Sequence, residues 1–225
     1  MSKNDYWKLS AYESANLIRN GSISAEDLVS SCIERTKETN NKINAIVDDL
    51  SVPALEKARE LDKLTKKGDF KGPLHGVPIT IKENIDQKGY ATPNGLEALK
   101  DLIALGNAPV VDNLERDGAI VIGRTNTPEF SMRGTTDNVI HGRTFNPWND
   151  WASPGGSSGG ASAAVMSGMG SLAHGNDIAG SLRIPSTATG ACTVKPGLGR
   201  VPAYNPSQTQ ERGLIAQLMS VQGVI

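Results

Sequence analysis

The chain has 225 residues with 23 basic and 24 acidic side chains, so its formal net charge is −1. This balance argues against nucleic acid or an anionic membrane as the main partner, since both favour a basic face. The hydrophobic content of 38% is ordinary for a globular protein with a sizeable core. Cys32 and Cys192 are too few for a disulfide scaffold, and neither belongs to a C-x-x-C pair, so we expect no thiolate zinc site.

The N-terminal residues carry no apolar run of the kind that a signal peptide needs. Residues 151–176 lack charged side chains over 26 residues, which is long enough to span a bilayer. This stretch is nonetheless mostly Gly, Ser and Ala, and is therefore unlike a membrane helix. We expect a soluble, cytoplasmic protein with no membrane partner.

Residues 1–70 have the features of a helical segment. Ser10 and Glu13 have the spacing of a capping box, in which the hydroxyl and the carboxylate each satisfy a free backbone N–H. Ser24 precedes a second helical pattern, and a third begins at Ser51. We interpret the apolar stripes of these helices as packing faces.

Beyond this segment the pattern changes to an alternation of strands and helices. Residues 77–81 form a short β-branched run typical of a buried strand, and residues 119–122 form another. Between them, residues 109–116 predict a helix. This alternation is typical of an α/β fold, so we assign residues 71–225 to an α/β core.

Between Trp151 and Val194 the composition shifts to small residues, and the only charged side chains are Asp177 and Arg183. A region of this length with so little charge is expected to lie inside the fold. Its serines then need hydrogen-bond partners, because a buried hydroxyl without one is costly.

The most distinctive motif is Pro154-Gly-Gly-Ser-Ser-Gly-Gly160, for which three functions compete. A phosphate-binding P-loop needs Lys and then Ser or Thr after its last glycine, and Ala-Ser follows instead. A G-x-S-x-G nucleophile elbow fits around Ser157 or Ser158. However, the only downstream histidine, His174, precedes Asp177, which is the wrong order for that class of hydrolase.

Lys82 offers the third function, a serine hydroxyl activated by a lysine. Serine is a weak nucleophile until a base removes its proton. Burial lowers the pKa of a lysine, so a desolvated lysine can be neutral and act as that base. Lys82 follows the buried run 77–81 directly. On this evidence alone, an exposed strand-end lysine beside Glu83 is the simpler interpretation.

Residues 175–185 combine small residues with Ser181, and we expect them to form a turn that leads into a helix. Such a turn presents several backbone N–H groups in one direction, which suits an oxyanion. Ser181 would lie beside these donors. The alternative is a plain glycine-rich turn in which Ser181 caps the helix.

The chain resembles the amidase signature family in four motifs that occur in the same order. They are Gly76-Val-Pro-Ile-Thr-Ile-Lys82-Glu-Asn-Ile, the segment 154–160, Asp177-Ile-Ala-Gly-Ser181-Leu-Arg-Ile-Pro185, and Val194-Lys-Pro-Gly197. The resemblance covers almost the whole chain and implies an α/β fold whose mixed central β-sheet is covered by helices on both faces. It also implies hydrolysis of a small-molecule carboxylic amide through an acyl-enzyme, with no metal or organic cofactor.

Matched position by position, the resemblance implies a Ser–cisSer–Lys triad. Lys82 would be the general base, Ser157 the bridging serine and Ser181 the nucleophile. The spacing of 24 residues between the two serines agrees with the family pattern and favours Ser157 over Ser158.

The resemblance assigns the oxyanion hole to the N–H groups of Ile178, Ala179, Gly180 and Ser181. Ala179 departs from the family pattern, which usually has glycine there, and a methyl group is tolerated only where φ is negative. The chain is also much shorter than family members. We therefore expect the N-terminal part of a longer fold, with an incomplete sheet.

The resemblance extends to the A subunit of the aminoacyl-tRNA amidotransferase, which hydrolyses glutamine and works with partner subunits. A truncated, inactive family member is a further alternative. The sequence leaves open whether the protein forms a homodimer or binds a partner subunit.

Overall fold

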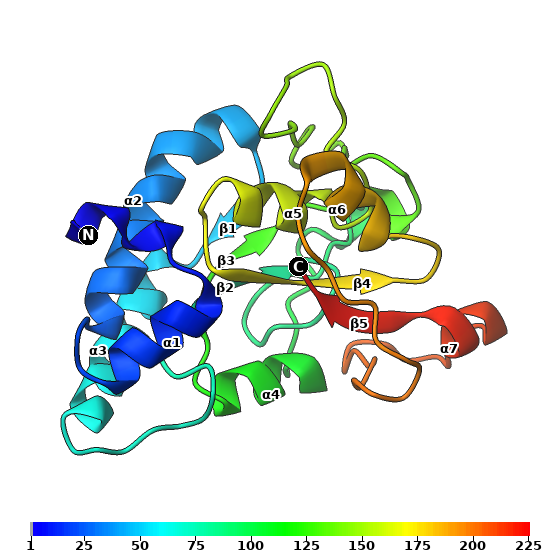
Figure 1. Cartoon of the computed structure of the whole chain (residues 1–225). Helices are drawn as coiled ribbons and strands as arrows, with labels where there is room; N and C mark the ends of the chain where they lie inside the picture. The colour runs from blue at the N-terminus through cyan, green and yellow to red at the C-terminus, as the bar shows by residue number, and fades with distance from the viewer. Residues whose placement is uncertain (1) are drawn as a thin grey trace.

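A computed structural model describes residues 2–225, which form a mixed five-stranded sheet with helices on both faces (Figure 1). The strand order is β1-β3-β2-β4-β5. The central strand β2 pairs in parallel with β3 and β4, whereas the outer strands β1 and β5 are antiparallel to their neighbours. The strands are β1 (Ile46–Asp49), β2 (Pro78–Lys82), β3 (Ile120–Thr125), β4 (Leu172–Asp177) and β5 (Val221–Val224).

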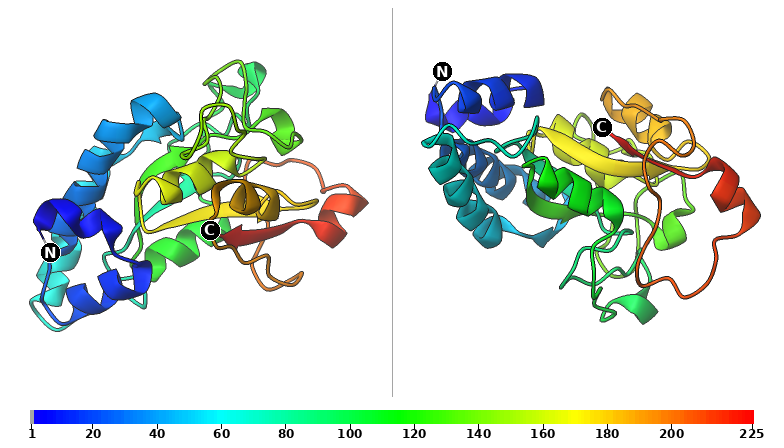
Figure 2. Two further views of the ribbon diagram at one scale, coloured as in Figure 1. Left: turned by 45° about the horizontal axis from the view of Figure 1, so that its top comes forward. Right: turned by 90° about the horizontal axis from the view of Figure 1, so that it is seen from below.

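The α-helices of the described residues are α1 (Ala11–Arg19), α2 (Ala25–Ile43), α3 (Ser51–Thr65), α4 (Pro109–Arg116), α5 (Gly159–Met166), α6 (Arg183–Thr189) and α7 (Leu214–Met219). Short 3-10 helices span Lys3–Lys8, Glu97–Leu99 and Glu129–Ser131. Helices α5 and α6 lie over one face of the sheet and α4 lies over the other, while α1, α2 and α3 form a group at one end of the molecule (Figures 1 and 2).

Capping side chains fix the starts of the N-terminal helices as the sequence predicts. Ser10 Oγ accepts the Glu13 N–H and the Glu13 carboxylate accepts the Ser10 N–H, which completes a capping box at α1. Ser24 Oγ accepts the Asp27 N–H at the start of α2. Strand β1 also lies in this segment, where only helices were expected. Its four residues are too few to show an alternating pattern, and pairing with β3 holds them extended.

Alternate residues of the central strands divide the core between the two faces of the sheet. Ile81 and Val121 pack with the apolar residues of α4. Ile120 and Ile122 point the opposite way and pack with α2 and α3. Lys82 follows Ile81 and therefore points away from α4, toward the face that α5 covers (Figure 1).

The glycine-rich region lies inside the fold, as expected from its lack of charge. Residues 154–164 are all buried. At Gly156, an added Cβ would collide with the carbonyl oxygen of Arg133, so only glycine fits this crossing of two backbones. Among the helices of residues 2–225, none has the length and apolar character needed to cross a membrane.

Candidate active site

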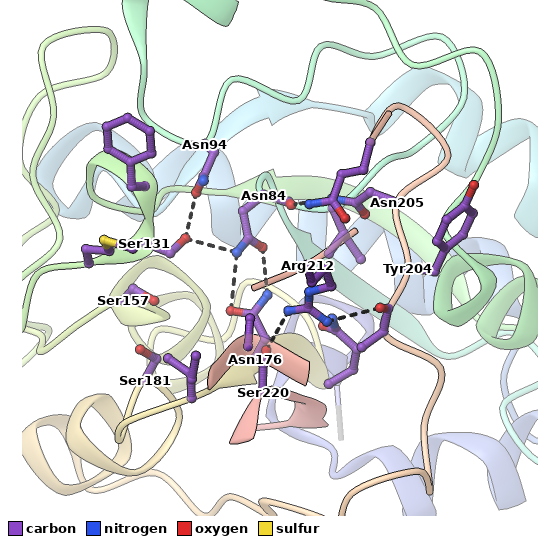
Figure 3. Close-up of a pocket in the computed structure, with 18 of the residues that line it drawn as sticks. Asn84, Asn94, Ser131, Ser157, Asn176, Ser181, Tyr204, Asn205, Arg212 and Ser220 are labelled. Carbon is purple, nitrogen blue, oxygen red and sulfur yellow. Dashed lines mark hydrogen bonds between the residues drawn. The ribbon is translucent and has the colours of Figure 1, made fainter. Parts of the chain in front are cut away.

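A cavity of about 350 Å³ lies at the carboxyl ends of β2 and β4 (Figure 3). These strands are parallel neighbours, so the residues that follow them meet at one edge of the sheet. Asn84 and Ile178, which come just after the two strands, both line the cavity. Ser157 and Ser181 line it as well, and Figure 3 shows them on the same side.

Lys82 ends β2 with its side chain fully buried beneath this cavity. Its Nζ lies 2.7 Å from Ser157 Oγ, 3.1 Å from Ser158 Oγ and 2.8 Å from Asn176 Oδ1. The interpretation of Lys82 as an exposed strand-end lysine is therefore wrong. The local sequence misleads because the groups that cover Lys82 come from segments 75 or more residues away.

The pKa of Lys82 is far below its ordinary value. Burial disfavours the charged ammonium and lowers this pKa to about 7, against the opposing effect of the negative charges of Glu83 and Asp177. A substantial fraction of the Lys82 side chains is thus neutral near pH 7. A neutral amine can accept a proton, as a general base must.

Ser157 and Ser158 stand at the start of α5 but differ in their contacts. The peptide bond between Gly156 and Ser157 is cis. The Ser157 carbonyl oxygen accepts a hydrogen bond from Thr127 Oγ1 at 3.1 Å. The Ser158 N–H donates to the Ser181 carbonyl oxygen at 3.1 Å. Ser157 lines the cavity, and Ser158 instead ties α5 to the turn that carries Ser181.

Ser181 lies in the turn between β4 and α6, as the sequence predicts. Leu182, not Ser181, is the N-cap residue of α6, and the side chain that accepts the Leu182 N–H at the start of this helix is that of Asp177. The alternative role of Ser181 as a helix cap is therefore wrong. The described side chains also provide no hydrogen bond to the Ser181 hydroxyl, which lines the cavity. Such contacts are often long before substrate binds.

Asp177 organises the same turn with its buried carboxylate. Its Oδ1 accepts the Gly180 N–H at 2.9 Å and its Oδ2 accepts the Leu182 N–H at 3.1 Å. Arg183 donates to both oxygens, at 2.9 and 3.0 Å. Burial alone would raise the pKa of Asp177, but the hydrogen bonds from Arg183 and the two backbone N–H groups lower it to about 2. The carboxylate is thus charged throughout the working range of pH.

The backbone of the turn determines which of the expected oxyanion donors are available. The N–H of Gly180 is already bound to Asp177, which leaves those of Ile178, Ala179 and Ser181 as candidates. Gly180 has a φ of 117°, which favours glycine, whereas Ala179 is not among the described residues with positive φ. The methyl group of Ala179 is therefore compatible with the turn.

A chain of polar side chains beside the cavity escaped the sequence analysis. Asn176 Nδ2 donates to Asn84 Oδ1 at 2.9 Å, and Asn84 Nδ2 donates to Ser131 Oγ at 2.9 Å (Figure 3). The Ser131 hydroxyl donates in turn to Asn94 Oδ1 at 2.7 Å. The position of Asn84 two residues after Lys82 was the one available signal, because a side chain just beyond a strand end points toward such an edge.

Arg212 supplies a positive charge to the far side of the cavity (Figure 3). Its guanidinium donates to the carbonyl oxygen of Ala203 at 3.0 Å and to Ser220 Oγ at 2.9 Å. Both contacts lie in the segment that leads through α7 to β5, so this wall of the cavity is built by the last part of the chain.

Comparison with known proteins shows where this architecture recurs. The Amidase family model matches residues 27–225. The chain is 54% identical over 221 residues to the indoleacetamide hydrolase of Bradyrhizobium diazoefficiens, covering 98% of this chain and 42% of that protein. It is 40% identical over 187 residues to the A subunit of the glutamyl-tRNA(Gln) amidotransferase of Natranaerobius thermophilus, covering 83% of this chain and 38% of that protein.

A solved structure of an amidase has a fold similar to that of this chain. A bacterial aryl acylamidase of the amidase signature family matches with a TM-score of 0.86 and 33% identity, covering 96% of this chain and 44% of that one. The chain therefore belongs to the amidase signature family, and the mixed α/β fold predicted from its motifs is confirmed. It spans about two fifths of the length of these relatives.

Proposed function

We propose that this chain carries the catalytic residues of an amidase, which hydrolyses a carboxylic amide through an acyl-enzyme on Ser181. One observation carries the proposal. The buried amine of Lys82 lies 2.7 Å from Ser157 Oγ, and Ser157 lines the same cavity as Ser181. A base, a bridging hydroxyl and a nucleophile are thus available at one cavity wall.

The reaction begins when neutral Lys82 accepts the Ser157 proton while Ser157 accepts the proton of Ser181. Ser181 Oγ attacks the amide carbonyl carbon, and the N–H groups of Ile178, Ala179 and Ser181 stabilise the resulting oxyanion. Each such donor contributes about 3–4 kcal/mol to a reaction of this kind. The carbon–nitrogen bond then breaks as Ser157 and Lys82 return a proton to the leaving amine. Water then attacks the ester carbonyl carbon as Ser157 and Lys82 take its proton. The bond between this carbon and Ser181 Oγ breaks, the proton returns to Ser181 Oγ, and the acid leaves.

The substrate in this proposal is a small primary amide with an aromatic group. The similarity to an indoleacetamide hydrolase supports this class. Phe130 and Met132 offer apolar surface at the cavity, which the polar side chains of Asn176 and Asn205 also line. The aromatic ring of such a substrate would pack on Phe130 and Met132, while the amide group of the substrate reaches Ser181.

A fluorophosphonate probe tests the proposed function. The probe reacts with activated serines, so incubation of the chain should give an adduct at Ser181 that mass spectrometry can map. Ser181→Ala should give no adduct, and ammonia release from indole-3-acetamide should disappear with it. A folded, soluble chain that forms no adduct at Ser181 would contradict the proposal and favour an inactive family member.

A glutamine-hydrolysing A subunit is the second candidate function, and two observations favour it. The chain is 40% identical to such a subunit, and Arg212 places a guanidinium at the cavity. A guanidinium binds carboxylates well, and glutamine carries an α-carboxylate beside its α-amine. Faster hydrolysis of glutamine than of indole-3-acetamide, lost in Arg212→Ala, would support this function. Co-purification with partner subunits would support it further.

A further inference from the structure

Three oxygen atoms surround the Lys82 amine at hydrogen-bond distance. They are Ser157 Oγ at 2.7 Å, Asn176 Oδ1 at 2.8 Å and Ser158 Oγ at 3.1 Å. A neutral lysine amine has two N–H bonds and one lone pair, so two of these oxygens receive a hydrogen atom and the third must give one. A carboxamide oxygen can only accept, so Asn176 takes one of the two N–H bonds.

Ser158 is placed to take the second N–H bond. Its own hydroxyl hydrogen has an acceptor in the carbonyl oxygen of Asn176, 3.3 Å away, which leaves its lone pairs for Lys82. The Lys82 lone pair then faces Ser157 Oγ, the closest of the three oxygens. This is the orientation in which a base can remove the Ser157 proton.

We propose that Asn176 is a positioning residue, which turns the lone pair of Lys82 toward Ser157 Oγ. The inference rests on the proposed function, because it assigns Asn176 a role in that proton transfer. Asn176 touches neither the cleaved bond nor the nucleophile in this scheme and acts only through Lys82.

The neighbouring side chains fix which way the Asn176 amide points. Asn94 accepts the Ser131 hydroxyl hydrogen, so Ser131 Oγ accepts from Asn84 Nδ2 (Figure 3). Asn84 Oδ1 is then left to accept Asn176 Nδ2 at 2.9 Å. A flipped Asn176 would press its NH₂ group against Lys82 and its oxygen against Asn84 Oδ1. The network therefore holds the acceptor oxygen on the lysine.

Several residues near this hydrogen-bond network have backbone angles that are energetically unfavourable. Asn94, Phe130 and Ser131 have φ values of 49°, 54° and 56°, and they are three of the four non-glycine residues with positive φ in residues 2–225. Such values are unfavourable for residues that carry a Cβ atom. Two of these three residues, Asn94 and Ser131, supply the far end of the hydrogen-bond chain to Asn176.

The charges around Lys82 determine what a substitution at Asn176 should do. Glu83, which follows β2, and Asp177, which ends β4, both raise the pKa of Lys82, while burial lowers it to about 7. Burial also lowers the pKa of His174 on β4 to about 4, so His174 is neutral near pH 7. The covering helix α5 carries no charged side chain. Asn176→Asp would add a third negative charge beside the amine.

The test measures the rate of fluorophosphonate labelling of Ser181 between pH 5 and pH 10. Asn176→Asp keeps the side-chain shape and an acceptor oxygen, although it loses the hydrogen bond that Asn176 Nδ2 donates to Asn84 Oδ1. Its charge should hold Lys82 protonated. Labelling at pH 7 should fall about fivefold and recover by pH 9–10, which corresponds to an alkaline shift of about one pH unit. Asn176→Leu removes the acceptor, so labelling should be slow at every pH without an alkaline shift. A merely structural role would not separate the two variants in this way.

Asn149→Asp is the matched control. Asn149 is exposed, and its Oδ1 accepts the Trp151 N–H at 2.8 Å, a bond that aspartate would keep. The same change of charge is thus made without a contact to Lys82, and the wild-type pH profile should result. Thermal melting followed by circular dichroism shows whether each variant is folded.

An NMR titration of chain labelled with ¹³C-lysine separates this inference from the proposed function. The Lys82 signal is assigned by its loss in Lys82→Arg. A titration midpoint raised by one unit or more in Asn176→Asp supports the inference even if Ser181 is never labelled, a result that would refute only the proposed function. An unmoved midpoint, together with a wild-type labelling profile, would overturn the inference and leave the proposed function intact.

Discussion

Lys82 Nζ and Ser157 Oγ lie 2.7 Å apart, although neither side chain is accessible to solvent. The two residues are 75 positions apart in sequence and meet because β2 ends beneath the start of α5. Burial gives this lysine its chemistry, since it lowers the pKa to about 7. The same burial opposes folding, because an unfolded chain keeps an ordinary, protonated lysine.

Replacing Lys82 should therefore change how stability depends on pH. The folded-state pKa is about 7 and the ordinary lysine value is 10.5, so between these values the unfolded chain binds a proton that the folded chain lacks. The free energy of unfolding then rises with pH across this window, by up to about 1.4 kcal/mol per pH unit. Lys82→Met should lose this rise, and it should also lose labelling at Ser181. Urea denaturation at several pH values from 6 to 10 measures the effect.

The exposed Lys67 provides the control for this prediction. Lys67→Met should keep the wild-type increase of stability with pH, because Lys67 is exposed and lies outside the hydrogen-bond network around Lys82. Equal slopes in wild type and Lys82→Met would show that Lys82 is not desolvated in the folded protein.

The two adjacent serines should differ in their importance. Ser157 lies closer to Lys82 and lines the cavity, whereas Ser158 binds the backbone of the Ser181 turn. Ser157→Ala removes the proposed relay and should slow labelling of Ser181 by about 10²-fold or more. Ser158→Ala leaves the relay intact and should cost less than tenfold. Labelling time courses of the two variants, measured in parallel, show which loss is larger. A larger loss in Ser158→Ala would assign the bridging role to Ser158 instead of Ser157.

The sequence predicts those features that depend on neighbouring residues better than those that depend on contacts between distant segments. The capping box of Ser10 and Glu13 and the apolar run of β2 depend on neighbours within a few residues, and both occur as expected. The pairing of Asn84 with Asn176 depends instead on β2 and β4 lying side by side, which joins residues 92 positions apart. No local pattern encodes such a contact. The roles proposed for Lys82, Ser157 and Ser181 come from motif resemblance, and the structure adds a cavity that Ser157 and Ser181 share above the buried Lys82.

Asp177 should link the Ser181 turn to acid stability. Although burial alone would raise its pKa, hydrogen bonds from Arg183 and from the N–H groups of Gly180 and Leu182 lower it to about 2. A pKa below the unfolded value means that this carboxylate stabilises the fold above about pH 4. The contribution is lost as the pH falls toward 2.

Asp177→Asn tests this role. The variant should be less stable than wild type at pH 7 and should show a smaller loss of stability between pH 4 and pH 2. Labelling of Ser181 should also slow, because the turn loses one of the two acceptor oxygens that order its backbone. Denaturation curves at pH 7, 4 and 2.5 give the comparison. A variant that matched wild type at all three values would show that the contacts of Asp177 stabilise neither the turn nor the fold.

Gly180 should be the least tolerant position of this turn. Its φ is 117°, and an added Cβ would lie 2.8 Å from Ile184 Cδ1, so Gly180→Ala combines backbone strain with a steric clash. Residues forced into such a conformation cost about 1–3 kcal/mol. Ala179→Gly is the matched control, since Ala179 is exposed and is not among the described residues with positive φ. Its cost should stay below about 1 kcal/mol. Urea denaturation and labelling of Ser181 should thus both show a large loss in Gly180→Ala and a small one in Ala179→Gly. The reverse order would mean that the turn adopts another backbone conformation in solution, and the proposed oxyanion donors would then have to be reassigned.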